Sequence, residues 1–381
     1  MGDKEWKFVD EQCQKLGFIR RSNQSKYASA TIVVRKKDEN GDYTDFKKCG
    51  DYRPLNIESN PDRYQLPLIE SIFNDMKRAQ LFNKLDLRSG YHQMALLELD
   101  RSKTAFWGAQ RILWEWCVVP FGLKNAPSCF QRQMDKVLSR LPFTRCYIDD
   151  IVIWSRTMKE HLGHLSAVFV RLGTAGLKVH PSKCQFAVSE IDFLGHRVSA
   201  EGLSPQQEKV QAVRDLVPPV DISGLRSALG LFSYYRKFVK NFITIAAPLH
   251  ALLKKGVLWH WEIEQQTSFG GLKDKLCSTS VLKRPDPSLS YFLDTDWSQK
   301  GMGAVLSQID SDGKKRSVSF ASRACNPAER NYGSCEGECL AVVWATQHFR
   351  EYLSGSPFTL VTHHEPLKWL MQTNKTTGKL A

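Results

Sequence analysis

Apolar residues recur along the chain with two different spacings. Short apolar runs bounded by turn residues predict strands or hairpins at 32–37, 81–87, 146–154, 185–198, 291–306 and 358–362. The turn of the 185–198 hairpin is expected near Ser189 and Glu190. Spacings of three or four residues predict helices over 64–77, 125–138, 161–175, 223–252 and 334–353. This mixture predicts an α+β chain.

The helical stretch after Ser223 is also basic, with four cationic residues among its apolar positions: Arg226, Arg236, Lys237 and Lys240. Such a stretch could lie along a phosphate backbone, or it could be an ordinary solvated helix face. Residues 282–290 are rich in proline and polar residues, which predicts a linker to a last domain.

Composition narrows the classes of protein. The 381 residues are enough for two or three domains, and a formal charge of +13 favours a polyanionic partner, although a basic protein need not have one. The N-terminus lacks the apolar run of a signal peptide, and no apolar run is long enough to span a membrane. The ten cysteines form no CxxC pair, so we expect reduced thiols, no zinc site, and a cytoplasmic or nuclear location.

Three acids lie in or beside apolar strands. Asp86 ends one predicted strand, and Asp149 and Asp150 form the tip of a predicted hairpin. Buried carboxylates are costly unless cations compensate them, and for neighbouring carboxylates a divalent cation is a better partner than a single lysine or arginine. Mg²⁺ held by one or two carboxylates and substrate phosphates suits phosphoryl transfer, with two ions about 3.5–4 Å apart. A solvated acidic turn is the alternative interpretation of the pair.

Motifs around these acids decide between the two interpretations. Residues 84–93 (KLDLRSGYHQ), 120–127 (PFGLKNAP), 147–150 (YIDD) and 193–196 (FLGH) resemble, in order and spacing, motifs of reverse transcriptases from Gypsy-type LTR retrotransposons. The resemblance implies a right-hand polymerase fold with fingers, a ferredoxin-like palm and a helical thumb. It also implies RNA-directed and DNA-directed DNA synthesis on a primer, with an RNA or DNA template and deoxynucleoside triphosphates as partners.

The resemblance assigns roles to individual positions. Asp86 and Asp149 would bind two Mg²⁺ ions, with Mn²⁺ as an alternative, and Asp150 would be the third catalytic acid. The nucleotide-binding positions would be Lys36, Lys47, Tyr91 and Phe121, with Tyr91 as the steric gate against a 2′-hydroxyl. The primer grip would be Phe193, Leu194, Gly195 and His196. Asp51 and Arg53 would form a structural ion pair, and Lys183 would be either a proton donor to pyrophosphate or a surface lysine.

The last hundred residues resemble an RNase H domain with a changed site. Asp296 in DTDWS and Glu338 in EGECLAVVW match the first two acids, but THHEPL places His363 where that family has the third. Imidazole does not neutralise Mg²⁺ and prefers softer metals, so RNase H activity is expected to be weak or lost.

The predicted division is an N-terminal extension over 1–28, fingers and palm over 29–204, thumb and connection over 205–281, and an RNase H-like α/β domain over 282–381, truncated at its C-terminus. Two functions remain open. The first is an active polymerase, which the three polymerase acids favour. The second is a decayed remnant of an element that binds nucleic acid without synthesis, which the changed RNase H site and the unusual stretch 107–117 favour. A plain RNase H-like nuclease fits poorly, and nothing in the sequence indicates an oligomeric state.

Overall fold

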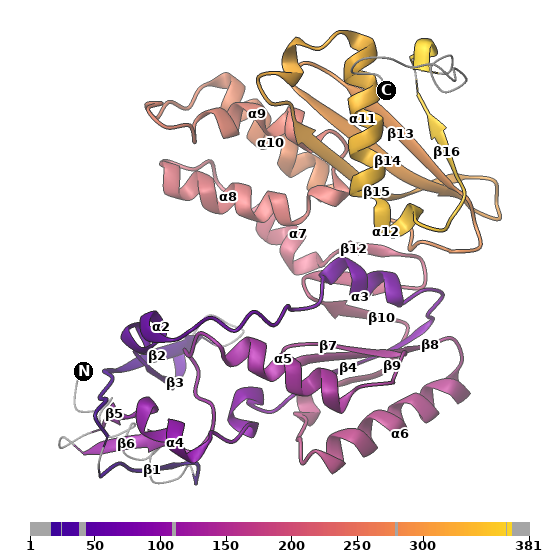
Figure 1. Cartoon of the computed structure of the whole chain (residues 1–381). Coiled ribbons are helices and arrows are strands. Elements are labelled where there is room, and N and C mark those ends of the chain that lie inside the picture. Colours follow the sequence, from indigo (N-terminus) through magenta and orange to yellow (C-terminus); the bar gives the residue numbers. More distant parts are fainter. Residues whose placement is uncertain are drawn as a thin grey trace. The chain divides into compact units, whose positions relative to one another are not determined.

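The computed structural model (Figure 1) describes residues 17–23, 25–37, 43–108, 112–278, 281–362 and 364–367, and over 33–37 and 43–49 it describes backbone only. The chain forms two compact units. One comprises the residues up to Ile72 together with Leu81–Val188, and the other comprises Phe73–Gln80 together with the residues from Ser189 onward. Among the described residues, no helix is both long enough and apolar enough to cross a bilayer.

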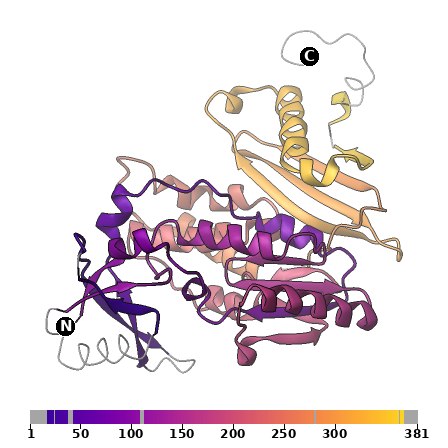
Figure 2. The same cartoon turned by 60° about the horizontal axis from the view of Figure 1, so that its bottom comes forward.

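A four-stranded sheet of order β7-β8-β4-β9 is the centre of the first unit. Its strands are Thr144–Tyr147 (β7), Asp150–Ser155 (β8), Leu81–Asp86 (β4) and Gln185–Val188 (β9). Helices α5 (Ala126–Val137) and α6 (Met158–Thr174) pack against it, and the shared core includes Leu85, Phe130, Ile151 and Val168 (Figure 2). The predicted strand at 81–87 and hairpin at 146–154 are confirmed.

Helix boundaries follow capping residues and prolines. Helix α6 begins three residues earlier than predicted, because the Thr157 side chain accepts a hydrogen bond from the Glu160 N–H as its N-cap. Gly176, with φ +71°, follows its end. The helix predicted over 64–77 is wrong in extent: α3 covers only Ile69–Asp75. Pro67 explains the difference, since the residue before a proline disfavours helical backbone.

The rest of the first unit consists of small elements. One sheet joins β1 (Ile19–Arg21), β6 (Leu113–Trp116) and β5 (Phe106–Trp107), and a separate hairpin pairs β2 (Thr31–Lys37) with β3 (Tyr43–Gly50). Short helices are α2 (Arg53–Glu58), η1 (Gly90–Gln93), α4 (Glu98–Arg101), η2 (Ser102–Thr104) and η4 (Pro181–Lys183). The predicted strand at 32–37 is confirmed. Asn40 and Gly41 in the segment 38–42 (DENGD) predict a hairpin turn after it, and that segment lies outside the described residues.

The second unit begins with a three-stranded sheet: β10 (Glu190–Phe193), β11 (His196–Ser199) and β12 (Leu203–Pro205). This corrects the hairpin predicted over 185–198, because β9 pairs with β4 whereas β10 pairs with β11. The turn is at Leu194 and Gly195, not at Ser189. Both turn residues have positive φ (+46° and +72°), as a two-residue hairpin loop favours.

The helices that follow are α7 (Gln207–Arg214), α8 (Ile222–Tyr234), η5 (Arg236–Phe238), α9 (Phe242–Ala251) and α10 (Ile263–Cys277). Those within 223–252 confirm the helical spacing predicted after Ser223, whereas α7 and α10 were not predicted. The predicted linker 282–290 is more firmly held than expected. The Arg284 guanidinium donates to the carbonyl oxygens of Met76 and Ala79, both at 2.7 Å, and Arg78 pairs with Asp286 at 2.7 Å.

The chain continues into a sheet of order β15-β14-β13-β16. Its strands are Tyr291–Trp297 (β13), Gly301–Ile309 (β14), Lys315–Ala324 (β15) and Phe358–Val361 (β16), with β13 and β16 parallel. Helix α11 (Ser334–His348) lies across one face of this sheet (Figure 1), and η6 (Glu329–Asn331) and α12 (Arg350–Leu353) flank it in sequence. The single helix predicted over 334–353 is therefore divided in two at Phe349.

Candidate functional site

The three acids predicted to form the polymerase site, Asp86, Asp149 and Asp150, lie at one end of the central sheet of the first unit. Strands β4 and β8 are antiparallel, and their register places Asp86 directly opposite Asp150. Asp149 occupies the turn between β7 and β8, and its backbone carbonyl accepts a hydrogen bond from the Leu87 N–H at 3.2 Å. The two strand ends are thus tied together beside the acids.

Two lysines approach these carboxylates at long range. Lys84 Nζ lies 3.5 Å from Asp150 Oδ1, and Lys183 Nζ lies 3.9 Å from Asp86 Oδ1. Like charges directly opposite each other in a sheet are destabilising, and two loose ion pairs offset this only in part. Since the Asp86 and Asp150 side chains are about a quarter to a third exposed (27% and 31%), a cation from solvent could reach them.

The donor set fits a hard divalent cation. Carboxylate oxygens are the ligands that Mg²⁺ prefers, and Mg²⁺ commonly uses one or two carboxylates together with substrate phosphates. Across the described ranges, no group of three or more histidine, cysteine, aspartate or glutamate side chains is placed so that it could hold a metal ion. The acids therefore suit an open site that substrate oxygens would complete.

A buried glutamine on α5 supports the acidic turn. Ile148 has φ +55°, a conformation that is rare for a β-branched residue. Gln131 Oε1 accepts a hydrogen bond from the Ile148 N–H at 2.8 Å, and Gln131 Nε2 donates to the Cys146 carbonyl at 2.9 Å. Gln131 is fully buried, so these bonds are shielded from water. The sequence analysis missed this residue, whose only signal was a polar position on an apolar helix face.

The residues after Asp86 form the floor beside Asp149. A Cβ atom at Gly90 would overlap the Asp149 carboxylate and lie 3.0 Å from Phe130 Cζ, so a larger residue there would displace that carboxylate. The Tyr91 ring packs against Phe121 and Phe130, with centroids 5.4 and 5.5 Å apart. Burial, and secondly the charge of Asp149, raise the pKa of Tyr91. The structure thus brings Tyr91, Phe121 and Asp149 together.

The other two predicted nucleotide-binding residues, Lys36 and Lys47, are described only in their backbone. Their strands, β2 and β3, pair in the predicted hairpin. The predicted ion pair is present: Arg53 donates to both carboxylate oxygens of Asp51 at 2.8 and 2.6 Å. These hydrogen bonds lower the pKa of Asp51 to about 2.

The predicted primer grip is the β10–β11 hairpin of the second unit. Phe193 and His196 are buried, whereas Leu194 and Gly195 at the turn are partly exposed. Burial, and secondly the charge of Lys237, lower the pKa of His196 to about 3, so its ring is neutral at ordinary pH. Any contact with a ligand must therefore involve the turn itself, not the two flanking side chains.

The predicted RNase H positions lie in β13 and α11. Asp296 is exposed near the end of β13, and Glu338 Oε1 accepts a hydrogen bond from the N–H of the next residue, Trp297, at 3.4 Å. The Glu338 carboxylate thus lies next to the backbone of the residue that follows Asp296. His363 lies outside the described residues, two positions beyond Val361, which pairs with Asp294.

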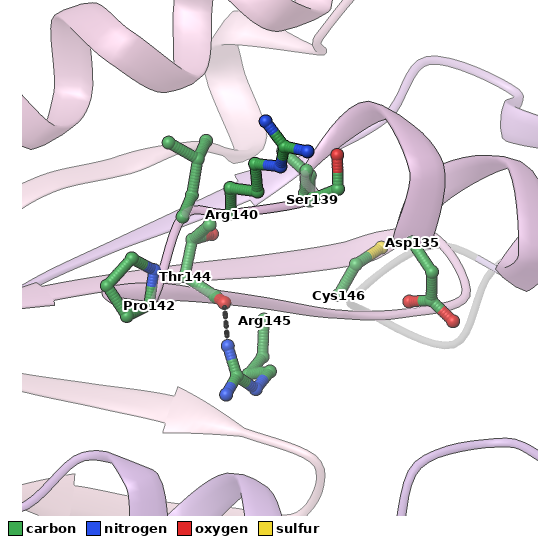
Figure 3. A pocket seen from close by; sticks show the side chains of 9 residues that line it. Asp135, Ser139, Arg140, Pro142, Thr144, Arg145 and Cys146 are labelled. Atoms are coloured by element: carbon green, nitrogen blue, oxygen red, sulfur yellow. Dashed lines mark hydrogen bonds between the residues drawn. The ribbon is translucent and has the colours of Figure 1, made fainter.

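A cavity of about 380 Å³ lies in the first unit at the end of α5 and the start of β7, lined by Asp135, Leu138, Ser139, Arg140, Leu141, Pro142, Thr144, Arg145 and Cys146. Its two arginines point away from each other, and Arg145 donates to the Thr144 carbonyl at 2.8 Å (Figure 3). Because its charges do not converge, the cavity has no evident role in the chemistry of the acids.

Comparisons with known proteins identify the family of this chain. Residues 35–198 match the family model described as reverse transcriptase (RNA-dependent DNA polymerase), and residues 261–360 match the RNase H-like domain found in reverse transcriptase. The Drosophila melanogaster Pol polyproteins of transposons 297 and gypsy are 39% and 37% identical to this chain over 98% of its length. The chain belongs to the reverse transcriptase/RNase H family of Gypsy-type LTR retrotransposons.

This retrotransposon Pol segment covers only 35% and 37% of those two polyproteins. Foamy viral protease-reverse transcriptases solved with double-stranded DNA and with an RNA/DNA hybrid superimpose with TM-scores of 0.83 and 0.78. The superpositions cover 96% and 100% of this chain, and 63% and 52% of the foamy viral chains, at 23% and 21% identity. The likeness confirms the predicted α+β fold of a right-hand polymerase followed by an RNase H-like domain.

Proposed function

We propose that this reverse transcriptase segment is an active RNA-directed and DNA-directed DNA polymerase that adds deoxynucleotides to a primer 3′-hydroxyl. The observation that carries the proposal is the convergence of three acids at the joined ends of β4 and β8, where Asp86 lies opposite Asp150 and Leu87 bonds to Asp149. Acids from separate strands that meet in this way are the arrangement that nucleotidyl transfer requires.

In this proposal Asp86 and Asp149 hold two Mg²⁺ ions, or Mn²⁺ in their place, while Asp150 and Lys84 adjust the local charge. The ions would supply activation of the primer hydroxyl and charge neutralisation at the leaving pyrophosphate. Gln131 keeps the acidic turn in place, so that Asp149 need not reorganise when substrate binds.

Side chains near the acids would select and hold the nucleotide. The Tyr91 ring, fixed between Phe121 and Phe130, would crowd a 2′-hydroxyl and favour deoxynucleoside triphosphates. Lys36 and Lys47 on the β2–β3 hairpin would bind the triphosphate, as the family resemblance implies.

The template–primer, of RNA or DNA, is the proposed macromolecular partner. A formal charge of +13 favours phosphate contacts, whose strength should fall steeply with salt. The hairpin of Phe193, Leu194, Gly195 and His196 would hold the primer strand. In the proposed division, residues 29–204 are fingers and palm, 205–281 thumb and connection, and 282–381 the RNase H-like domain, after an N-terminal extension over 1–28.

RNase H activity is proposed to be weak or lost, because His363 stands where the third acid of that site is expected. Incubating the chain with an RNA–DNA hybrid and Mg²⁺ tests this, with Asp296→Asn as the control variant. Cleavage by the natural sequence that Asp296→Asn abolishes would refute the proposal.

Primer extension tests the polymerase proposal. The wild type should extend oligo(dT) on poly(rA) with dTTP and Mg²⁺, EDTA should stop the reaction, and Asp149→Asn should lose it. No extension by a folded wild-type chain that still retains the hybrid in a salt-sensitive gel shift would favour the second function, nucleic-acid binding without synthesis.

A further inference from the structure

We propose that Tyr234 and Tyr235, at the end of α8, are positioning residues that hold the primer-grip turn in the orientation needed to bind the primer strand. The inference rests on the proposed polymerase function. Tyr234 Oη donates a hydrogen bond to the Leu194 carbonyl at 2.7 Å, and Tyr235 Oη donates to the Gly195 carbonyl at 2.9 Å. Two consecutive helix-end tyrosines therefore bind the two consecutive carbonyls of one turn.

The turn needs such support. Leu194 has φ +46° and Gly195 has φ +72°, and a left-handed conformation at a leucine costs about 1–2 kcal/mol. His196 Nδ1–H also donates to the Leu194 carbonyl at 2.7 Å, and the Gln206 N–H donates to the Gly195 carbonyl at 3.1 Å. Each carbonyl thus accepts two hydrogen bonds, one of which comes from a tyrosine.

These bonds determine which polar group of the turn remains for a ligand. In a trans peptide the C=O and N–H point in opposite directions. Because the Leu194 carbonyl points at Tyr234 and His196, the Gly195 N–H points away from them. A phosphate oxygen needs a donor such as this N–H, whereas a flipped peptide would present a carbonyl and repel the phosphate. The tyrosine hydroxyls oppose this flip.

Packing alone does not explain both tyrosines. Tyr235 is buried, and a buried tyrosine usually finds a partner for its hydroxyl. Tyr234, however, is 43% exposed, and water could satisfy its hydroxyl, yet that group is committed to the Leu194 carbonyl. The approach of Tyr235 also depends on the small residue in the turn, since a Cβ at Gly195 would lie 3.0 Å from Tyr235 Oη.

The variants Tyr234→Phe, Tyr235→Phe and the double variant remove the hydroxyls and keep the rings. Tyr64→Phe is the matched control, because its hydroxyl bonds to Asp135 in the first unit, on a different element. Steady-state extension of oligo(dT) on poly(rA) should show KM for the primer–template raised about 3- to 10-fold by each single substitution, as the loss of one hydrogen bond implies. The kcat at saturating primer–template and the KM for dTTP should stay close to wild type, and the melting temperature should fall by only a few degrees, as the loss of one hydrogen bond implies.

Direct binding separates failure of this inference from failure of the proposed function. Fluorescence anisotropy with a labelled recessed-3′ primer–template should show weaker binding by the double variant and unchanged binding by Tyr64→Phe. If the wild type does not extend, the polymerase proposal fails, and the binding comparison still decides the role of the tyrosines. Equal affinities of the wild type and the double variant, or a loss of kcat and melting temperature without a change in primer affinity, would overturn the inference.

Discussion

Replacing Gly90 with alanine tests whether the position of the Asp149 carboxylate controls activity. The added Cβ would overlap that carboxylate, lying 2.9 Å from its Cγ and 3.0 Å from Phe130 Cζ. Phe130 is 1% exposed within the core and has no room to move away. The Asp149 side chain must therefore turn aside, out of the position that it occupies beside Gly90.

The expected magnitude follows from this displacement. A methyl group that overlaps a carboxylate requires a movement of roughly 1 Å, and misplacing a catalytic group by about 1 Å costs on the order of 100-fold in rate. Overpacking costs about 1–3 kcal/mol, so the variant should still fold. Gly90 is not among the glycines with positive φ, so alanine should add no backbone strain there.

Primer extension at saturating substrates, together with thermal unfolding, measures both effects. Gly163→Ala is the matched control: nothing lies within 4 Å of its Cβ position on α6, so activity should be unchanged. Alanine there should even stabilise the helix by about 0.5–1 kcal/mol. A Gly90→Ala chain that extends primers at the wild-type rate would refute the assignment of Asp149 as a catalytic acid held by close packing.

Three other perturbations have definite expected outcomes. Gln131→Leu leaves the Ile148 N–H without its acceptor and should lower the free energy of unfolding by about 1–3 kcal/mol in urea melts. An unchanged urea midpoint would show that Gln131 does not stabilise the turn at Ile148. Arg284→Met removes charged donors from the Met76 and Ala79 carbonyls and should lower the melting temperature by several degrees, since each such bond contributes about 1.5–3 kcal/mol. Burial lowers the pKa of His196 to about 3, so the folded chain protonates this ring less readily than the unfolded chain does. The contribution of neutral His196 to stability is therefore complete above about pH 6.5. It falls by about 1.4 kcal/mol per pH unit as the pH drops from there toward 3. Urea melts at pH 7.5 and 5.5 should show this loss, and equal slopes for the wild type and His196→Asn would exclude His196 as its source.

The parts of the fold that the sequence predicted are those with local signals. The acidic hairpin was predictable because Asp149 and Asp150 interrupt an apolar run, and β-strands alternate or end at such breaks. Strand β4 was predictable for the same reason, with Asp86 at its end. The roles of these acids came from motif order, which local hydrophobicity does not supply.

The parts that the sequence did not predict depend on distant partners. The 185–198 segment alternates like one hairpin, yet β9 finds its partner about a hundred residues earlier in β4, and pairing across such separations leaves no local trace. Residues 282–290 have linker composition, but Arg284 bonds to carbonyls more than two hundred residues away. Gln131 was missed because a single polar residue on a helix face does not indicate which distant backbone groups it will bind, here the Ile148 N–H and the Cys146 carbonyl.

Each unit contains a tight hairpin turn held by a side chain from a helix. Ile148 and Leu194 both have positive φ, which is unfavourable for these side chains and persists only where the surroundings hold it. Gln131 from α5 binds the N–H of the first, and Tyr234 from α8 binds the carbonyl of the second. The first turn carries the acid proposed to bind metal and the second the backbone N–H proposed to bind the primer, so both proposed substrate contacts depend on backbone orientation. Substitutions that spare every catalytic carboxylate but remove these helix-borne bonds should therefore still impair synthesis.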